Sequence, residues 1–255
     1  MRRWIASGLV LLVAAALAGA VGQVPSALAR VEAFRITEIR LEGNRFLTNE
    51  EAAKAVAISP LASVWDDFKP LEERLQGHVL VEKARAKRRF PNTLLLEVVE
   101  TIPVALIPNP ALEPVDGSGR FLPIDPAEHR LDLPIVGLRE SKRGVTLSAA
   151  ERRLLAGEIA RLGVSDPDLV ARISEVRLDA RGDLWAQLWR QNSQGELWDL
   201  PVTLRFRPSL PGRRFQEGMR VLDDAMNRFE GAVVADLDLR FEEQVVVRLN
   251  KVRGN

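Results

Sequence analysis

The sequence of 255 residues contains no cysteine, no tyrosine and only two histidines, His78 and His129. The absence of cysteine excludes disulfides, thiolate nucleophiles, iron–sulfur clusters and cysteine-based zinc sites. Two histidines leave no multi-histidine metal centre, and a Ser-His-Asp triad would have to use one of them. The net charge of +1 provides no bulk positive field for nucleic acid. These shortages exclude many enzyme classes, while a hydrophobic content of 46% suffices for a folded core.

Familiar catalytic motifs are also missing from the sequence. It contains no glycine-rich phosphate loop, no Gly-X-Ser-X-Gly elbow and no His-Glu-X-X-His motif. Asp236 and Asp238 form an Asp-X-Asp pair, but no nucleotide-binding Rossmann unit precedes them. Asp66 and Asp67 are expected to be a solvated loop pair, and His78 is expected to stabilise a helix end. We therefore predict no catalytic residue, no cofactor and no metal site.

The N-terminus carries the longest uncharged run. Arg2 and Arg3 precede residues 4–24, which hold no charge and span about 30 Å as a helix, the thickness of one bilayer core. The two arginines favour a cytoplasmic N-terminus. The prediction is a cytoplasmic tail over residues 1–3, a transmembrane helix over 4–24 and a linker over 25–33. A cleaved signal peptide ending just before Arg30 is the alternative, and both interpretations export the rest of the chain.

Residues 34–101 predict a small α+β domain in the order strand, helix, helix, strand, strand. One helix start carries a capping box, and the other carries a proline suited to a first turn. Two helices can then cover one face of a three-stranded sheet. The expected strands are residues 36–41, 81–89 and 94–98, and the expected helices begin after Thr48 and at Pro70.

A basic strip lies on the second of these strands. The simplest interpretation is a solvated strand face, and the alternatives are an acidic partner or anionic lipid headgroups near the anchor. The strip consists of Lys83, Arg85, Lys87, Arg88 and Arg89.

Residues 102–255 predict a β-rich domain with at least two helices. Residues 115–121 are expected to form a hairpin, and residues 173–189 form a second one. A capping box at Ser148 predicts one helix. A second, core-facing helix is predicted by apolar residues spaced four and three apart, and a terminal pair of strands is expected over 233–241 and 244–249. The apolar stripe consists of Phe215, Met219, Leu222, Met226 and Phe229.

Several phrases resemble the POTRA domain of FtsQ/DivIB cell-division proteins. They are Ile39-Arg40-Leu41-Glu42-Gly43-Asn44, the stretch from Ala84 to Leu94, and Glu100-Thr101-Ile102-Pro103-Val104-Ala105. Near the end of the chain, Asp236-Leu237-Asp238-Leu239-Arg240-Phe241 resembles the family's signature before its last strand, with Phe241 where tyrosine is usual. The segment His78-Val79-Leu80-Val81 stands where the family usually has Pro-Trp-Val.

The resemblance implies a complete architecture of the α+β class. An N-terminal transmembrane helix is followed by a POTRA domain (β-α-α-β-β) over residues 34–101 and by a C-terminal β-rich domain over residues 102–255. In this arrangement the protein is a single-pass protein of the bacterial cytoplasmic membrane, and most of the chain is extracytoplasmic.

The resemblance also implies a function. It is that of a non-enzymatic divisome scaffold in septum formation, which binds FtsB- and FtsL-like proteins, other divisome components and the cytoplasmic membrane, but no nucleic acid. FtsB-like partners would dock on the last strand as a sheet edge. Carried over by motif, the partner-binding residues are Arg240, Phe241, Glu243, Val245 and Val247.

An exported POTRA chaperone or assembly factor for outer-membrane proteins is the alternative function. Such proteins usually carry several POTRA repeats, whereas this sequence contains one POTRA-like unit. A mature N-terminus at Arg30 would favour this alternative, because it would mean that the apolar run is removed as a signal peptide.

The retained anchor can be tested directly. N-terminal sequencing of the membrane-bound protein is expected to show that the mature chain still contains residues 4–24. A mature chain beginning at Arg30 would contradict the anchor and support a cleaved signal peptide.

Overall fold

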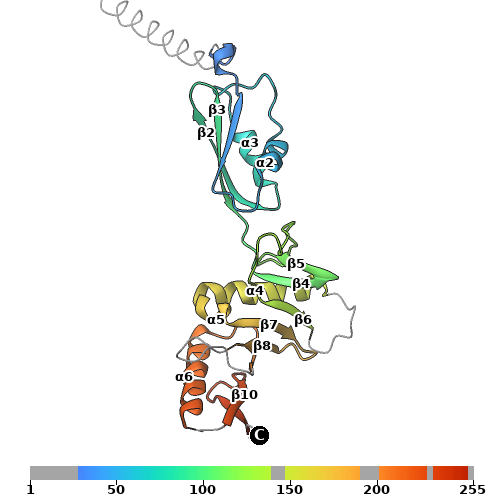
Figure 1. Ribbon diagram of the computed structural model, residues 1–255, viewed down its shortest axis with the longest axis vertical. Coiled ribbons are helices and arrows are strands. Elements are labelled where there is room, and N and C mark those ends of the chain that lie inside the picture. The colour runs from blue at the N-terminus through green and yellow to red at the C-terminus, as the bar shows by residue number, and fades with distance from the viewer. Residues whose placement is uncertain (1–27, 139–146, 190–200, 229–231, 252–255) are drawn as a thin grey trace, which may run out of the picture. The chain divides into compact units, whose positions relative to one another are not determined.

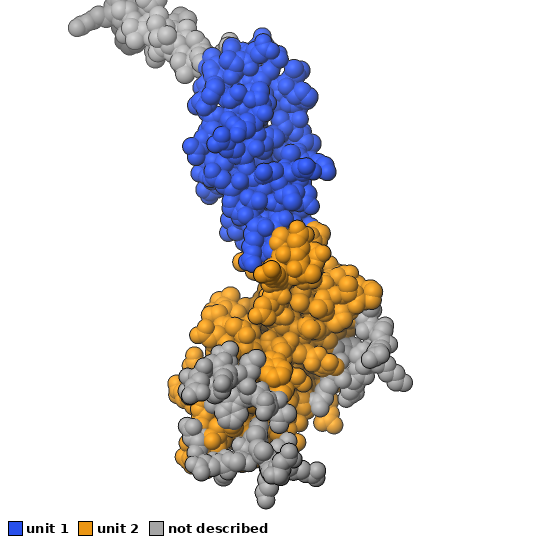
Figure 2. Space-filling view, in the orientation of Figure 1, with its two compact units in different colours: residues 1–101 blue, residues 102–255 orange. Residues whose placement is uncertain are grey.

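The computed structural model describes residues 28–138, 147–189, 201–228 and 232–251 (Figure 1). The chain divides into two compact units, residues 1–101 and residues 102–255 (Figure 2). Within the described ranges no helix is both long and apolar enough to cross a membrane. The predicted span over residues 4–24 lies outside the described residues.

Unit 1 has the predicted order of strand, helix, helix, strand, strand. Its sheet has the strand order β1-β3-β2, with β1 parallel and β2 antiparallel to the central β3. A short 3-10 turn, η1 (Glu32–Phe34), comes first. The elements are β1 (Glu38–Glu42), α2 (Asn49–Val56), α3 (Lys69–Gln76), β2 (Val81–Arg89) and β3 (Thr93–Glu100).

The two helices cover one face of this sheet. The predicted capping box is present, since the Thr48 side chain accepts from the Glu51 N–H and the Glu51 carboxylate accepts from the Thr48 N–H. Pro70 lies in the first turn of α3, as predicted. Helix side chains such as Val56 and Leu75 are fully buried, as are Leu94 and Leu96 of the central strand β3.

A buried carboxylate ties the end of β3 to the loop before α2. Glu100 is 8% exposed, and its two oxygens accept from the N–H groups of Arg45, Phe46 and Leu47 at 2.7–3.1 Å. The carboxylate thus accepts hydrogen bonds from three consecutive backbone N–H groups of the loop, which would otherwise lack a hydrogen-bond partner within the domain. Sequence reasoning gave Glu100 no such role, because its partners lie 53–55 residues away.

Unit 2 is built on one eight-stranded sheet with the order β11-β10-β9-β8-β7-β6-β4-β5. Its strands are β4 (Ala105–Asn109), β5 (Ala111–Val115), β6 (Ile135–Leu138), β7 (Ile173–Leu178), β8 (Leu184–Leu188), β9 (Val202–Phe206), β10 (Ala232–Asp238) and β11 (Val246–Lys251). Its helices are α4 (Ala149–Ser165), α5 (Pro167–Ala171) and α6 (Gly212–Arg228). The predicted β-rich domain with two or more helices is thus confirmed.

The three helices contribute to a single apolar core with the sheet. Phe206 of β9 and Phe215 of α6 meet edge to face with ring centroids 5.0 Å apart. From α4, Leu155 and Ile159 enter the same cluster. The predicted helical stripe is confirmed for the described residues, since Phe215 and Leu222 are buried and two methionines pack beside them. Phe229 lies outside the described residues.

Two expected strand segments differ from the structure, and a side chain explains each difference. The Asp116 carboxylate accepts from the N–H groups of Ser118 and Arg120, which closes a tight turn, so only one bridge, between Val115 and Phe121, forms where a hairpin was expected. The strand over 111–115 pairs instead with β4. At the C-terminal end, β10 stops at Asp238 rather than Phe241.

The hydrogen bonds that Glu100 accepts from the loop lead to a prediction about stability. Glu100→Gln replaces one accepting oxygen with an amide that faces backbone donors, so the free energy of unfolding of unit 1 is expected to fall by about 2 kcal/mol. The control is Glu97→Gln, because Glu97 makes an exposed ion pair with Lys87 and such pairs contribute about 0–1 kcal/mol. Urea unfolding followed by circular dichroism measures both. An equal loss of unfolding free energy in the two variants would contradict this role of Glu100.

Candidate partner-binding site

The last strand of the chain lies at an edge of the large sheet. β11 pairs antiparallel with β10 from Val246 opposite Asp238 to Lys251 opposite Ala232. In the described part of the chain no strand pairs with its other side. The backbone N–H and C=O groups on that side are therefore available to an incoming strand.

Helix α6 holds the loop that leads into β11. Arg214 donates from Nη2 to the carbonyl oxygens of Phe241 at 2.7 Å and Gln244 at 3.1 Å, and its other terminal nitrogen pairs with Glu217. Gly218 lets the helix pack closely on the end of β10, because a Cβ there would lie 3.3 Å from Leu237 Cδ2 and 2.7 Å from Cδ2 of Leu239, the residue just after the strand. These contacts fix where β11 begins.

Arg240 holds the other side of the same loop. Its guanidinium donates to both Asp238 oxygens, at 2.9 and 2.7 Å, and to Asp183 Oδ2 at 2.7 Å. The Arg240 N–H also bonds to Asp238 Oδ1 at 3.1 Å, which turns the chain and ends β10. The hydrogen bonds of Arg240 are therefore internal, and they connect the end of β10 to the turn before β8.

These hydrogen bonds shift the pKa values of Asp238 and Arg240. Burial raises the pKa of the Asp238 carboxyl, but hydrogen bonds from the Arg240 side chain and backbone outweigh burial, so the net pKa lies below its usual range. The hydrogen bonds that the Arg240 side chain donates to Asp238 and Asp183 raise the pKa of Arg240. The loop is thus stabilised by charged forms of both residues.

The other four predicted residues occupy two different environments. Phe241, with 44% of its surface exposed, and Glu243 lie on the outside of the loop. Val245 and Val247 are partly buried and pack against the core. The alternation of a strand places Val246, which is 36% exposed, on the opposite face from Val247. Val246 and Leu249, which is 38% exposed, are the exposed large apolar side chains of β11 among the described residues, and neither is among the five predicted binding residues.

The carboxylates weighed as catalytic candidates are occupied by structural contacts. Asp236 pairs with Arg205 at 2.9 Å, and Arg248 lies 4.0 Å from it. In the loop of unit 1, Asp66 and Asp67 are exposed and accept from backbone N–H groups. Across the described ranges no group of three or more histidine, aspartate or glutamate side chains could hold a metal ion.

His78 differs from its expected role. Its Nδ1 accepts from the Leu80 N–H at 3.3 Å, so the ring bonds to the chain that follows rather than to the end of α3. The backbone N–H of His78 bonds to the Leu75 carbonyl instead. The reason is that the chain turns sharply after Gln76 and brings Leu80 within reach of the ring.

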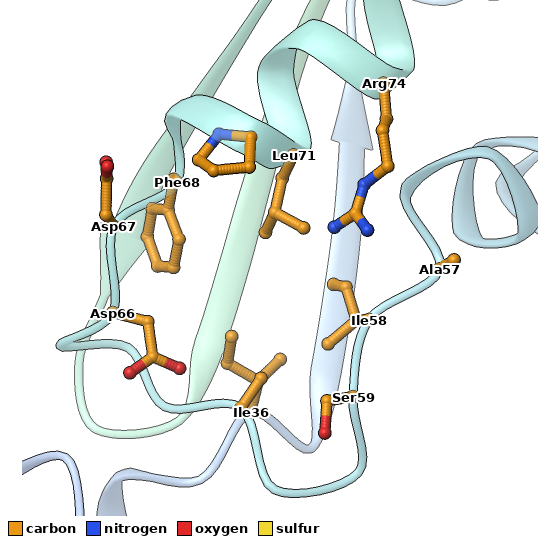
Figure 3. A pocket seen from close by; sticks show the side chains of 11 residues that line it. Ile36, Ala57, Ile58, Ser59, Asp66, Asp67, Phe68, Leu71 and Arg74 are labelled. Atoms are coloured by element: carbon orange, nitrogen blue, oxygen red, sulfur yellow. The ribbon is translucent and has the colours of Figure 1, made fainter.

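Unit 1 has a pocket of about 210 Å³ between α3 and the start of β1. Figure 3 shows apolar side chains of Ile36, Ile58 and Leu71 directed toward this hollow. Asp66 and Arg74 lie on opposite sides of it. The pocket contains no histidine and no arrangement of a nucleophile with a base, so the residues that line it supply no recognisable catalytic chemistry.

The outer edge of β2, in contrast to that of β11, is covered by side chains of α3. Glu72 accepts from the Ala86 N–H at 2.7 Å, and Gln76 donates to the Ala84 carbonyl at 3.2 Å. Two backbone groups that an added strand would need are therefore already bonded within the unit.

The topology of unit 1 identifies its class. Two helices inserted between the first and second strands, over a sheet of order β1-β3-β2, define a POTRA domain. Residues 34–101 match the family model for the FtsQ-type POTRA domain.

Two relatives extend the similarity beyond this domain. The chain is 31% identical over 156 residues to a cell division protein FtsQ of Myxococcus fulvus, covering 58% of this chain and 54% of the relative. It is 30% identical over 149 residues to a cell division protein FtsQ of Syntrophotalea carbinolica, covering 58% and 48%. The chain thus spans about half the length of the curated relatives it matches. The chain therefore contains a POTRA domain of the FtsQ type and is similar to these FtsQ proteins over 58% of its length.

The Arg240 contacts generate a pH-dependent prediction. Arg240→Gln leaves Asp238 and Asp183 without their charged donor and is expected to lower the free energy of unfolding of unit 2 by about 2–3 kcal/mol at pH 7. Because the folded-state pKa of Asp238 is lowered, its contribution is present above the unfolded pKa of about 3.9 and is lost as pH falls through the folded pKa. The difference between wild type and variant should therefore shrink at pH 3.

Urea unfolding followed by tryptophan fluorescence at both pH values provides this measurement. Arg248→Gln is the matched control, because Arg248 is 65% exposed and only 4.0 Å from Asp236, and exposed pairs contribute about 0–1 kcal/mol. A loss in Arg240→Gln that is the same at pH 3 and pH 7 would contradict the role given to Asp238.

Proposed function

We propose that this protein acts in bacterial cell division as a non-enzymatic scaffold, anchored in the cytoplasmic membrane by residues 4–24. Its POTRA domain and C-terminal domain lie outside that membrane. It binds FtsB- and FtsL-like division proteins, and the FtsB-like partner adds a strand to β11. The FtsQ-type POTRA domain and the name of both relatives, cell division protein FtsQ, support the role in division.

The observation that carries the binding mode is the difference between β11 and the other sheet edges. β1 is five residues long and exposes Glu38, Arg40 and Glu42, charges that discourage pairing. β5 contains Pro114, which has no N–H and whose carbonyl accepts from Leu122 at 2.8 Å. β2 is covered by Glu72 and Gln76 from α3.

By contrast, β11 offers a favourable surface for an added strand. Its six residues include exposed Val246 and Leu249, and in the described chain no strand other than β10 pairs with it. Strand addition would satisfy its free backbone groups and bury these side chains together with Phe241. Glu243 on the preceding loop and Arg248 on the strand would select a partner with complementary charges.

The scaffold role also agrees with the chemistry of the described residues. The carboxylates of Asp236, Asp238 and Asp183 are paired with arginines. Binding through a sheet edge needs none of these groups to react. The proposal accordingly assigns no substrate and no cofactor.

A pair of proline variants tests strand addition. Consecutive residues of a strand point their N–H groups to opposite sides of the strand. One of the two variants Val246→Pro and Val247→Pro therefore removes an N–H group that points away from the sheet, and the other removes a hydrogen bond to β10. The outward variant is expected to fold and to lose co-purification with the FtsB-like partner. In cells depleted of the native protein it should fail to prevent filamentation, which wild type prevents.

Tryptophan fluorescence and circular dichroism identify which of the two variants stays folded. The matched control is Leu112→Pro in β5, at an exposed residue on the opposite edge of the same sheet, and this variant should keep binding the partner. A folded outward variant that still co-purifies at the wild-type level contradicts strand addition. Normal division after clean deletion contradicts the role in division.

A further inference from the structure

Unit 1 ends in a cluster of three aromatic side chains. Phe34 and Trp65 meet edge to face with centroids 5.9 Å apart, and Phe90 lies 5.1 Å from Trp65 and 6.3 Å from Phe34. Phe90 remains 58% exposed despite these contacts. An aromatic ring held by two others and still open to solvent is a rigid apolar projection.

Three segments far apart in the sequence meet at this cluster. Thr37 donates its N–H to the Asn92 carbonyl at 3.0 Å, which joins the start of β1 to the β2–β3 turn. Ile36 donates to the Ala62 carbonyl at 2.9 Å, which brings in the loop between the helices. Figure 1 shows the first described residues, in blue, at the same end of unit 1 as the β2–β3 turn. We call this end, formed by residues 28–37, 60–65 and 88–92, the aromatic tip.

The exposed apolar side chains of unit 1 are concentrated at the aromatic tip. Large exposed hydrophobic residues in the described part of this unit are Val31, Leu61, Phe90 and Val99, with exposures of 43%, 71%, 58% and 52%. The first three belong to the tip. Val99 lies toward the other end of β3, six residues beyond Thr93 and about 20 Å from it along the strand.

Basic side chains surround this apolar projection. Arg30 and Arg89 are exposed, and Arg35 makes an exposed ion pair with Glu32 at 3.3 Å. Arg88 folds back, donating to the carbonyls of Val64 and Asp66. The acidic groups that face the tip are Glu32, Asp66 and Asp67, and the Asp66 carboxylate is engaged by the Ser63 N–H at 2.7 Å.

Chain length places the aromatic tip near the proposed membrane span. The uncharged run ends at Val24, seven residues before Val31. Even fully extended, seven residues reach only about 25 Å. The segment that enters the cluster therefore begins within that distance of the bilayer surface.

We propose that the aromatic tip contacts the extracytoplasmic surface of an anionic bilayer, with Phe90 and Leu61 in the lipid interface and Arg30 and Arg89 at lipid phosphates. Aromatic side chains favour the interface between hydrocarbon and water, and arginines next to them favour anionic headgroups. The contact rests on the proposed anchor, and it gives the exposed tip an apolar partner. It holds the POTRA domain at the membrane, while β11 in the other unit binds its protein partner by a separate surface.

The absence of cysteine allows a clean test by single-site labelling. The full chain is reconstituted in nanodiscs of phosphatidylcholine and phosphatidylglycerol, with an environment-sensitive fluorophore on Phe90→Cys, Leu61→Cys or Val99→Cys. The Leu61 variant keeps the aromatic cluster intact, and the Val99 variant is the matched control at the other end of the unit. Emission maximum and quenching by doxyl-labelled lipids report the depth of each position.

Positions 90 and 61 are expected to show blue-shifted emission and several-fold stronger lipid quenching than position 99. Equal, solvent-like emission at all three positions overturns the membrane contact. If the same sample still co-purifies with the FtsB-like partner, the proposed function stands without it. A chain that does not remain with the nanodiscs overturns both the contact and the anchor.

Discussion

The backbone hydrogen-bonding demand of sheet edges is the constraint on which this structure depends. Each edge strand leaves a row of N–H and C=O groups that must be satisfied by water, by side chains or by another strand. In unit 1, Glu72 and Gln76 satisfy two groups of β2, and in unit 2 a proline and the Leu122 N–H close part of β5. β11 has no comparable cover among the described residues, and the proposed function follows from that difference.

Much of unit 2 serves to hold this edge in position. Gly218 allows α6 to pack closely on β10, and Arg214 fixes the loop through the carbonyls of Phe241 and Gln244. Arg240 binds the same loop from its other side through Asp238 and Asp183. The arginine expected from sequence similarity to touch a partner thus has internal hydrogen bonds, and its effect on binding would be exerted through the position of β11.

The sequence was most informative where structure is local. Both capping boxes, at Thr48 and Ser148, are formed as predicted, because their partners lie three residues away. The order of elements in the POTRA domain and the core-facing stripe of α6 were also predicted, since strand and helix periodicities are properties of short segments.

Long-range side-chain contacts could not be predicted in this way. Glu100 binds backbone groups more than fifty residues away, and Arg240 reaches Asp183 across 57 residues. The predicted end of β10 was wrong because the Asp238 carboxylate accepts a hydrogen bond from the Arg240 N–H, which turns the chain. The alternating Asp-Leu-Asp-Leu pattern looks like a continuing strand and gives no sign of this turn. Val246 and Leu249 were not among the predicted residues because that choice followed similarity to the family, whereas their exposure is a property of the folded sheet edge.

Hydrogen exchange of the β11 amides tests the central claim most directly. With the FtsB-like partner bound to the reconstituted protein, the outward N–H groups, an alternate set within residues 246–249, should exchange markedly more slowly than in the free protein. The Ala86 N–H of β2, already bonded to Glu72, should be unchanged. Full occupancy by the partner without added protection anywhere along β11 would contradict binding by strand addition.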